Sequence, residues 1–421
     1  MTDAKEPQWL RERRTSAADR PPELPDQKQK GWEFTDLSGL DLASYSPARE
    51  GDLSAAERAT RVLPSVKDGY ELVQVDGSPS SDDFNDPGAN GRPTVPAVLP
   101  LDAAATRFPD LLSERLGTIV SADDPFVALN EAGWTGGALV YVPAGARLEA
   151  PVTLTAVQNE PDKMLNWRTL IVLEENAEAE VWEQYIPAAG GEAGMFNGVT
   201  ELIVGQGASL RYVCGQSLNE ESWVFASQRA EIERDGSLDW VALGFGSARG
   251  KVRMNTKLAG RGASAKVTGA YAGRGHQHLD YDTRQEHAAE DTTSDLAFRG
   301  VLGDQATAVW RGMIRVETTA QRTDAFQDCR NLILSPKAHA DAIPGLEIKA
   351  DDVRCTHAAA VVQLDQEQLY YLTARGIDEA SAKTLLIEGF LGELVERVPE
   401  GPAREALGGA LETRLAQMLS D

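Results

Sequence analysis

Short runs in which hydrophobic and polar residues alternate fill the middle of the chain. Each run follows a turn residue and a small residue, as in "AGARLEAPVTLTAV" and "GQGASLRYVCGQSL". Alternation with period two indicates strands. The turn residues recur at steps of 31, 31, 29 and 26, a spacing too short for a strand–helix–strand unit but suited to one coil of a β-solenoid. These markers are Gly145, Asn176, Gly207, Gly236 and Gly262.

A β-sandwich or a jelly roll would also give many short strands separated by turns. The small residue after each turn favours the solenoid, because stacked coils approach each other closely at their corners. We therefore expect a mainly β chain whose core is a solenoid over residues 96–363.

A helical region with a linker is expected before this core, over residues 1–95. Residues 7–19 place apolar side chains at helical spacing after a proline, which predicts a short amphipathic helix. Residues 54–66 predict a second helix with Ser54 as its N-cap. Residues 76–96 are dense in Gly, Pro, Ser and Asp and are predicted to form a long loop.

A second helical region is expected after the core, over residues 364–421, where the apolar period changes from 2 to 3.6. The pattern predicts a helix ending at Gly376, a helix from Asp378 to about Val398, and a third helix over 402–419. These helices would either cap the solenoid or dock a partner. The apolar face of the second helix consists of Leu385, Leu386, Phe390, Leu394 and Val395.

The chain of 421 residues is strongly acidic, with 65 acidic against 41 basic residues and a formal net charge of −24. Such a surface repels phosphate backbones and anionic lipid headgroups, so neither nucleic acid nor a membrane is expected as a partner. The first twenty residues contain no run typical of a signal peptide, and no stretch of 18 apolar residues occurs. The three cysteines are few and odd in number, which indicates free thiols in a reducing cytoplasm.

Motifs of an autonomous enzyme are not found: there is no phosphate-binding loop, nucleophile elbow or zinc-binding helix. One segment, "RGHQHLDYDTRQEHAAED", collects His276, His278, His287, Asp280, Asp282 and Glu290. Metal binding there is conceivable, but a polar, solvated strand is the preferred interpretation. Independent catalysis is therefore not expected.

The stretch "DDVRCTHAAAVV" places Cys355 and His357 two residues apart, so on a strand both side chains point to the same face. Cys329 precedes them by about one coil, which predicts that it lies on a neighbouring rung. Thiolate and imidazole are suitable ligands for iron and for iron–sulfur clusters. The alternative is that Cys355 is a small buried hydrophobic residue. Cys214, on another alternating run, is expected in the core.

Two segments resemble the SufB/SufD family of scaffold proteins of iron–sulfur cluster assembly. One is the long run "RNLILSPKAHADAIPGLEIKADDVRCTHAAAVVQLDQEQLYYLTARGIDEASAKTLLIEGFLGEL"; the other is "GWEFTDLSGL" near the start. The chain length and the "CTHA" segment resemble the SufD type, whereas SufB-type chains resemble "EHEATTS" there.

This resemblance implies a right-handed parallel β-helix between two helical regions. It also implies a non-catalytic subunit that pairs with a SufB-type paralogue and docks SufC-type ATPases on its C-terminal helices. His357 would then lie at the subunit interface and help to assemble a transient iron or iron–sulfur cluster. Cys329 falls where SufB-type chains carry their sulfur-acceptor cysteine, although many SufD-type chains lack a cysteine there.

Two other functions stay open at this point. Cys329 permits a SufB-type role, in which the chain itself accepts sulfur and holds the cluster. A carbohydrate-active β-helix protein or adhesin is a more remote alternative, because parallel β-helices are common in that class.

Overall fold

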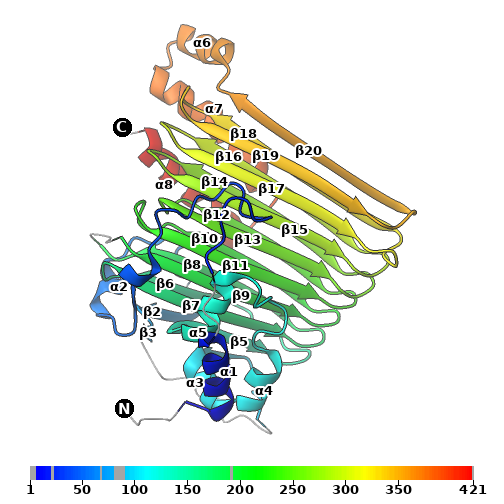
Figure 1. Cartoon of the computed structure of the whole chain (residues 1–421). Coiled ribbons are helices and arrows are strands. Elements are labelled where there is room, and N and C mark those ends of the chain that lie inside the picture. The colour runs from blue at the N-terminus through cyan, green and yellow to red at the C-terminus, as the bar shows by residue number, and fades with distance from the viewer. Residues whose placement is uncertain (1–5, 20–22, 67–68, 80–90, 190–192, 420–421) are drawn as a thin grey trace.

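The chain folds as a stack of β-coils with helices at its start and along one side (Figure 1). The structure is a computed structural model that describes residues 6–19, 23–66, 69–79, 91–189 and 193–419. From β5 onward, successive strands alternate between two sheets, so each coil gives one strand to each sheet. The prediction of a mainly β chain built on a parallel solenoid is confirmed, with about eight turns.

Sheet A and sheet B are parallel except at their first strands, where β4 pairs with β5 and β3 with β2 in antiparallel fashion. Sheet A contains β1 Ser46–Pro47, β4 Ala97–Pro100, β5 Gly136–Val142, β7 Lys163–Leu173, β9 Met195–Val204, β11 Trp223–Ile232, β13 Arg249–Leu258, β15 His278–His287, β17 Thr307–Val316 and β19 His339–Ile348. Sheet B contains β2 Tyr70–Val75, β3 Ser78–Pro79, β6 Val152–Gln158, β8 Glu178–Pro187, β10 Ser209–Gln216, β12 Ser237–Gly244, β14 Ser264–Gly273, β16 Thr293–Leu302, β18 Thr323–Ile333 and β20 Val353–Gln363.

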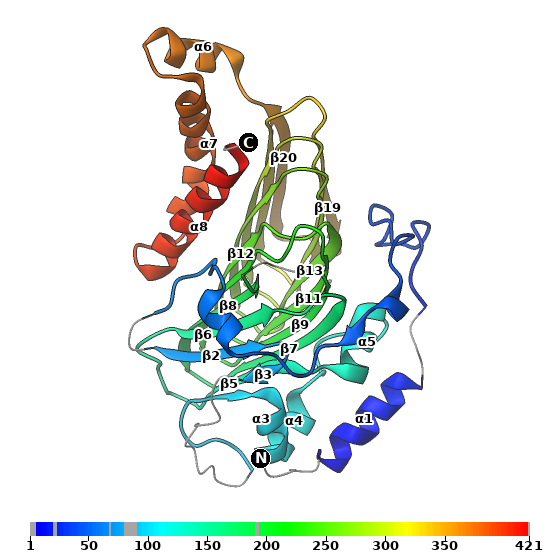
Figure 2. The same ribbon diagram turned by 90° about the vertical axis from the view of Figure 1, so that its left-hand side faces the viewer.

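The helices gather in two places. Those before the solenoid lie at its first coils, and α7 and α8 lie along the outer face of sheet B (Figure 2). Leucines and alanines of α7 and α8 form one buried cluster with Val241, Ala297 and Val301 of that face. The helices are α1 Gln8–Ala18, the 3₁₀ turn Leu42–Ser44, α2 Ser54–Arg58, α3 Leu101–Arg107, α4 Pro109–Arg115, α5 Pro125–Gly133, α6 Gln366–Ala374, α7 Glu379–Glu396 and α8 Pro402–Leu419.

One corner is built in the same way in seven successive coils. A residue with positive φ stands at the turn, and its N–H donates to a carbonyl oxygen of the following coil at 2.6–3.2 Å. The stacked residues are Gly145, Asn176, Gly207, Asp235, Gly262, Asp291 and Arg322. The repeat in the sequence therefore corresponds to this corner of the coils. The predicted marker Gly236 is one residue too late, because Asp235 has the left-handed backbone conformation. Asn and Asp tolerate this conformation nearly as glycine does.

The solenoid interior is filled by alternate residues of every strand, including the fully buried Trp167, Trp240 and Trp310. Large aromatic side chains supply much of the apolar area that a narrow stack of coils can bury. The predicted core residue Cys214 lies in this interior as a free thiol.

Two predictions at the N-terminal side need correction. The helix expected over 54–66 ends at Arg58, because the side-chain oxygen of Gln184 accepts hydrogen bonds from the backbone N–H groups of Val62 and Leu63 and holds this segment against sheet B. Ser54 is the first helical residue rather than the cap.

The expected boundary near residue 95 does not separate helix from strand, since β2 lies before it and three helices follow it. Most of the predicted loop, residues 80–90, lies outside the described residues. At the other boundary, β20 ends at Gln363 and α6 begins at Gln366.

The segment around "GWEFTDLSGL" crosses the outer face of sheet A and is fixed by a buried polar contact. Thr35 donates a hydrogen bond to Asp280, which also pairs with Lys251 at 2.6 Å. All three side chains are almost completely buried. Trp32 packs on Phe126 beside them, with ring centroids 5.4 Å apart.

Removal of Asp280 is expected to destabilise the fold strongly, because it leaves the buried ammonium group of Lys251 without a counter-charge. Asp280→Ala should lower the free energy of unfolding by about 3–5 kcal/mol, measured by urea unfolding at pH 7. Thr35→Val removes one hydrogen bond only and should cost about 1 kcal/mol. Equal losses in both variants would contradict this assignment.

His287 is expected to make the fold sensitive to mild acid. Its ring is fully buried between the hydroxyl groups of Thr292 and Ser294, each at 2.8 Å, and burial lowers its pKa to about 4. In the unfolded chain the imidazole takes up a proton near pH 6.5, whereas in the folded chain it does so only near pH 4. The free energy of unfolding therefore decreases as the pH falls from 6.5 to 4. The full contribution of His287 to stability is present above that range.

We expect the burial of His287 to lower the free energy of unfolding by roughly 2 kcal/mol at pH 5 relative to pH 8. His287→Gln keeps a hydrogen-bonding side chain and should remove that share, as measured by urea unfolding at both pH values. An unchanged pH dependence in the variant would show that other groups are responsible.

Candidate functional site at the open end of the solenoid

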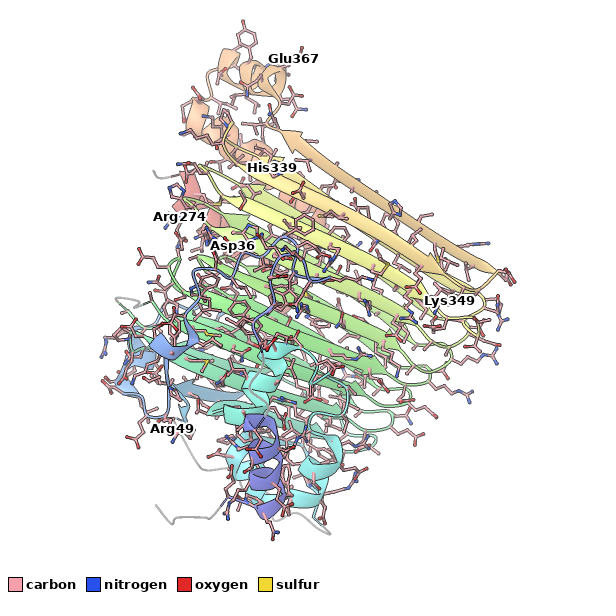
Figure 3. All side chains as sticks on the ribbon, viewed as in Figure 1. Asp36, Arg49, Arg274, His339, Lys349 and Glu367 are labelled. Carbon is pink, nitrogen blue, oxygen red and sulfur yellow. The ribbon has the colours of Figure 1, made fainter. Side chains whose placement is uncertain are left out.

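The two ends of the solenoid differ. At the first coils, α3 and α4 pack with β4 and β5 in one buried cluster. At the other end, β19 and β20 are the last strands of their sheets, and no described strand pairs with their free edges. Figure 3 labels His339 at the start of β19, Lys349 directly after its end, and Glu367 on α6 beyond the last coil.

Apolar side chains are exposed on this last coil and on β18 beneath it. At each of five positions, the exposed fraction of the residue is between 37% and 47%. They are Phe326, Ile343, Ile348, Val361 and Val362. A long hydrophobic edge of this kind is a template for pairing with another chain.

Cys355 and His357 share the inner face of β20, as predicted. They stand in register with Ala325 and Gln327 of β18, whose side chains are buried in the interior. His357 is exposed at the open end, whereas Cys355 is half-buried against a small apolar cluster. Burial, and then the nearby carboxylate of Asp324, raises the pKa of the Cys355 thiol.

Cys329 lies on the neighbouring rung and on the same inner face, in register with Ala359. The prediction that it faces the same wall as His357 is confirmed, with a diagonal offset that corresponds to roughly 8 Å between Cα atoms. Its thiol is fully buried, near the side chains of Asn331 and Tyr271 at 3.7 and 4.0 Å. Burial raises its pKa to about 12, so this thiol is protonated at neutral pH.

The described part of the chain contains no group of three or more His, Cys, Asp or Glu side chains placed to hold a metal ion. Cys329, Cys355 and His357 do not form such a group in the described structure, and their role as interface iron or cluster ligands stays a prediction. They supply one exposed imidazole and two thiols near an edge to which another chain has access.

The predicted docking face on α7 is only partly accessible. Leu385 is exposed, and Leu386 and Phe390 are half-buried, but Leu394 is fully buried against the outer face of sheet B. The prediction that Leu394 belongs to the docking face is therefore wrong. Leu394 packs inside the protein, because the C-terminal half of α7 lies against the sheet.

Sequence reasoning missed two aromatic residues on α6. Tyr370 and Tyr371 are 74% and 55% exposed, and Arg375 stacks on the Tyr371 ring at 4.6 Å. Their neighbour Leu369 is buried instead. The sequence feature that could have indicated them is the pair of tyrosines next to a single leucine. Where only the leucine of a short helix faces the core, both tyrosine rings lie on its solvent-exposed side.

The histidine-rich segment is not a solvated strand. His278 and Asp280 lie on the outer face of β15 beneath the N-terminal segment, while His287 points into the interior and His276 lies in the preceding turn. These histidines face different sides, so they do not converge on a metal.

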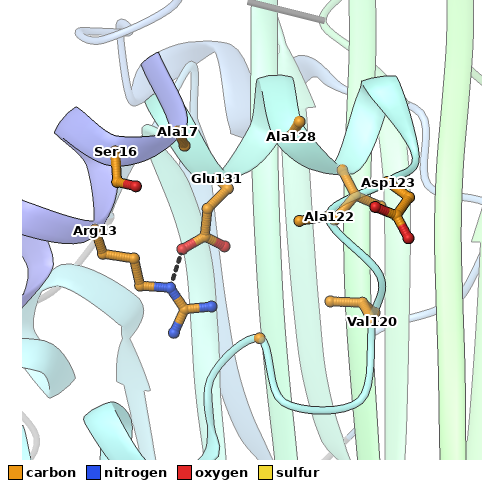
Figure 4. A pocket seen from close by; sticks show the side chains of 10 residues that line it. Arg13, Ser16, Ala17, Val120, Ala122, Asp123, Ala128 and Glu131 are labelled. Carbon is orange, nitrogen blue, oxygen red and sulfur yellow. Dashed lines mark ion pairs between the residues drawn. The ribbon is translucent and has the colours of Figure 1, made fainter. Parts of the chain in front are cut away.

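One hollow of the surface is remote from the open end. A cleft of about 470 Å³ lies between α1, α5 and the loop before α5 (Figure 4). Its main charged groups, Arg13 and Glu131, pair with each other. None of the predicted site residues lines it.

Within the described ranges, no helix is long and apolar enough to cross a membrane.

Comparison with known proteins identifies the family. Residues 155–390, more than half of the chain, match the family model described as SUF system FeS cluster assembly, SufBD core domain. A Bacillus subtilis protein named iron–sulfur cluster assembly protein SufD is 30% identical over 97% of this chain and 95% of its own length. A Synechocystis protein named as an iron–sulfur cluster assembly SufBD family protein is 29% identical over 89% and 84%. The chain therefore belongs to the SufBD family of SUF-system iron–sulfur cluster assembly proteins.

Proposed function

We propose that this chain is a non-catalytic, SufD-like scaffold subunit that pairs through β19 and β20 with a SufB-type paralogue in the cytoplasm. The observation that carries the proposal is the open last coil, with two strands of 10 and 11 residues and exposed apolar side chains. Partner strands would satisfy these backbone groups and cover the apolar edge. Membership in the SufBD family supports a partner from the same assembly system.

At that interface, His357 would contribute to the site where iron enters and a nascent cluster is assembled. Imidazole is a good iron ligand, and the exposure of His357 leaves its ring accessible to groups from the partner. Cys355 stands two residues away on the same face. Iron and the nascent cluster are cargo of the assembly rather than resident groups of this chain.

The alternative SufB-type role assigns direct sulfur acceptance to Cys329. A thiol reacts as its thiolate, and burial keeps this one protonated in the isolated chain. We therefore assign Cys329 a supporting part, in which pairing with the paralogue would first have to change its surroundings.

We expect His357→Ala to reduce iron–sulfur enzyme maturation in cells that rely on this system by tenfold or more, and His357→Ala with Cys329→Ser to reduce it further. His276→Ala is the matched control, since His276 is an exposed histidine in the turn before β15, outside the proposed pairing strands. Undiminished maturation in both His357 variants, with normal protein levels, would contradict the interface site.

The second part of the proposal is that a SufC-type ATPase docks on α6 and the exposed side of α7. Tyr370, Tyr371 and Leu385 offer apolar and aromatic anchors, which often carry most of the binding energy at interfaces. ATP hydrolysis would then belong to the partner.

Replacement of Tyr370, Tyr371 and Leu385 by alanine is expected to weaken ATPase binding at least tenfold, measured by calorimetry with the purified ATPase, while the thermal unfolding of the chain stays within about 2 °C. Tyr70→Ala, at an exposed tyrosine far from these helices, is the control and should bind normally. Full affinity of the triple variant would place the docking surface elsewhere.

A further inference from the structure

Gln327 stands beside His357 on the inner face of sheet B. The two residues are register partners on adjacent strands, so their side chains leave the sheet on the same side about 4.8 Å apart. The corresponding positions on the two preceding coils are Leu296 and Val267. The row therefore changes from apolar to polar in the last two coils, next to the open end.

The orientation of the Gln327 carboxamide is set by two carbonyl groups. Its Nε2 atom donates to the backbone oxygens of Gly312 and Gly345 on sheet A, at 3.4 and 3.2 Å. A flipped amide would bring its oxygen against both carbonyl oxygens, so the network fixes which end is which. The Oε1 atom is consequently the end of the carboxamide that remains available to accept a hydrogen bond.

The carboxamide is also confined sterically. A Cβ atom at Gly312 would lie 2.6 Å from Oε1 of Gln327 and 2.2 Å from the ring of Trp310, so the backbone at this point has no room for a side chain. Trp310 itself is fully buried. The carboxamide of Gln327 therefore packs against the backbone of Gly312 on sheet A.

That Oε1 atom is buried and accepts no hydrogen bond from the described part of the chain. Leaving a buried acceptor without a donor is energetically unfavourable. The thiol of Cys329 is already near Asn331 and is a weak donor in any case. The ring of His357, one rung away, has an N–H and forms no hydrogen bond of its own in the described structure.

We propose that Gln327 is the positioning residue for His357: in the assembled interface, Oε1 of Gln327 accepts a hydrogen bond from one ring N–H of His357. This bond would fix the tautomer and leave the other ring nitrogen unprotonated toward the partner and the iron. Residues that bind a metal through imidazole commonly have such an acceptor on the second nitrogen. The inference rests on the proposed role of His357.

The test uses the complex of the full chain with its paralogue and ATPase, supplied with iron(II) and sulfide, and measures the initial rate of cluster formation against pH. Gln327→Met removes the acceptor and should lower the rate 10- to 100-fold while the complex stays assembled. Gln327→Glu places a carboxylate beside the ring and should shift the acid limb of the pH profile upward by about one unit or more. Gln285→Met, at another buried glutamine of the interior, should leave the pH profile in place.

A second measurement guards against variants that fold poorly. The chain has five histidines, so nitrogen-15 histidine labelling and His357→Asn assign the ring signals by magic-angle spinning NMR of the sedimented complex. One defined tautomer of His357 that becomes a mixture in Gln327→Met supports the inference. An unchanged tautomer in that variant, or bonding of the His357 N–H to water, overturns it.

The two proposals fail in different ways. If His357→Ala abolishes cluster formation but both Gln327 variants match the unmodified complex in rate and pH profile, the positioning role is wrong and the proposed function stands. If His357→Ala forms clusters at the normal rate, the proposed role of His357 is wrong and this inference falls with it.

Discussion

Hydrogen bonds between the backbones of successive coils hold every strand of this protein in one register. Strand side chains alternate between two faces, so a slip of a single residue would turn each inner residue outward. The stacked corner with positive φ, from Gly145 to Arg322, sets the length of each coil and thereby protects the register. The proximity of Cys329, Gln327 and His357 depends on this register.

The same stacking creates the contrast between the two ends. A coil can satisfy its backbone only through its neighbours, so the first and last coils need other partners. Helices α3 and α4 cover the first coils, while α7 and α8 cover a side and leave β19 and β20 free. The open end is thus a consequence of where the C-terminal helices pack, and it gives another chain access to His357.

Burial divides the predicted ligands into two kinds. His357 is exposed, whereas the thiol of Cys329 is buried and protonated, which makes it unreactive until its surroundings change. A subunit with one accessible imidazole and one shielded thiol suits a site completed by a partner. Gln327 links the two rungs, because it lies in register with His357 and two residues from Cys329.

The sequence by itself determined the repeat, the strand alternation, the C-terminal helices and the shared face of Cys355 and His357, because these follow from local periodicity and turn chemistry. The tertiary structure decided what depends on packing between distant segments. Leu394 has the pattern of a free helix face yet is buried by sheet B, and the polar segment around His278 is covered by residues from the N-terminus. Neither contact is written in the local sequence, since long-range packing alone determines which face of an amphipathic element meets solvent.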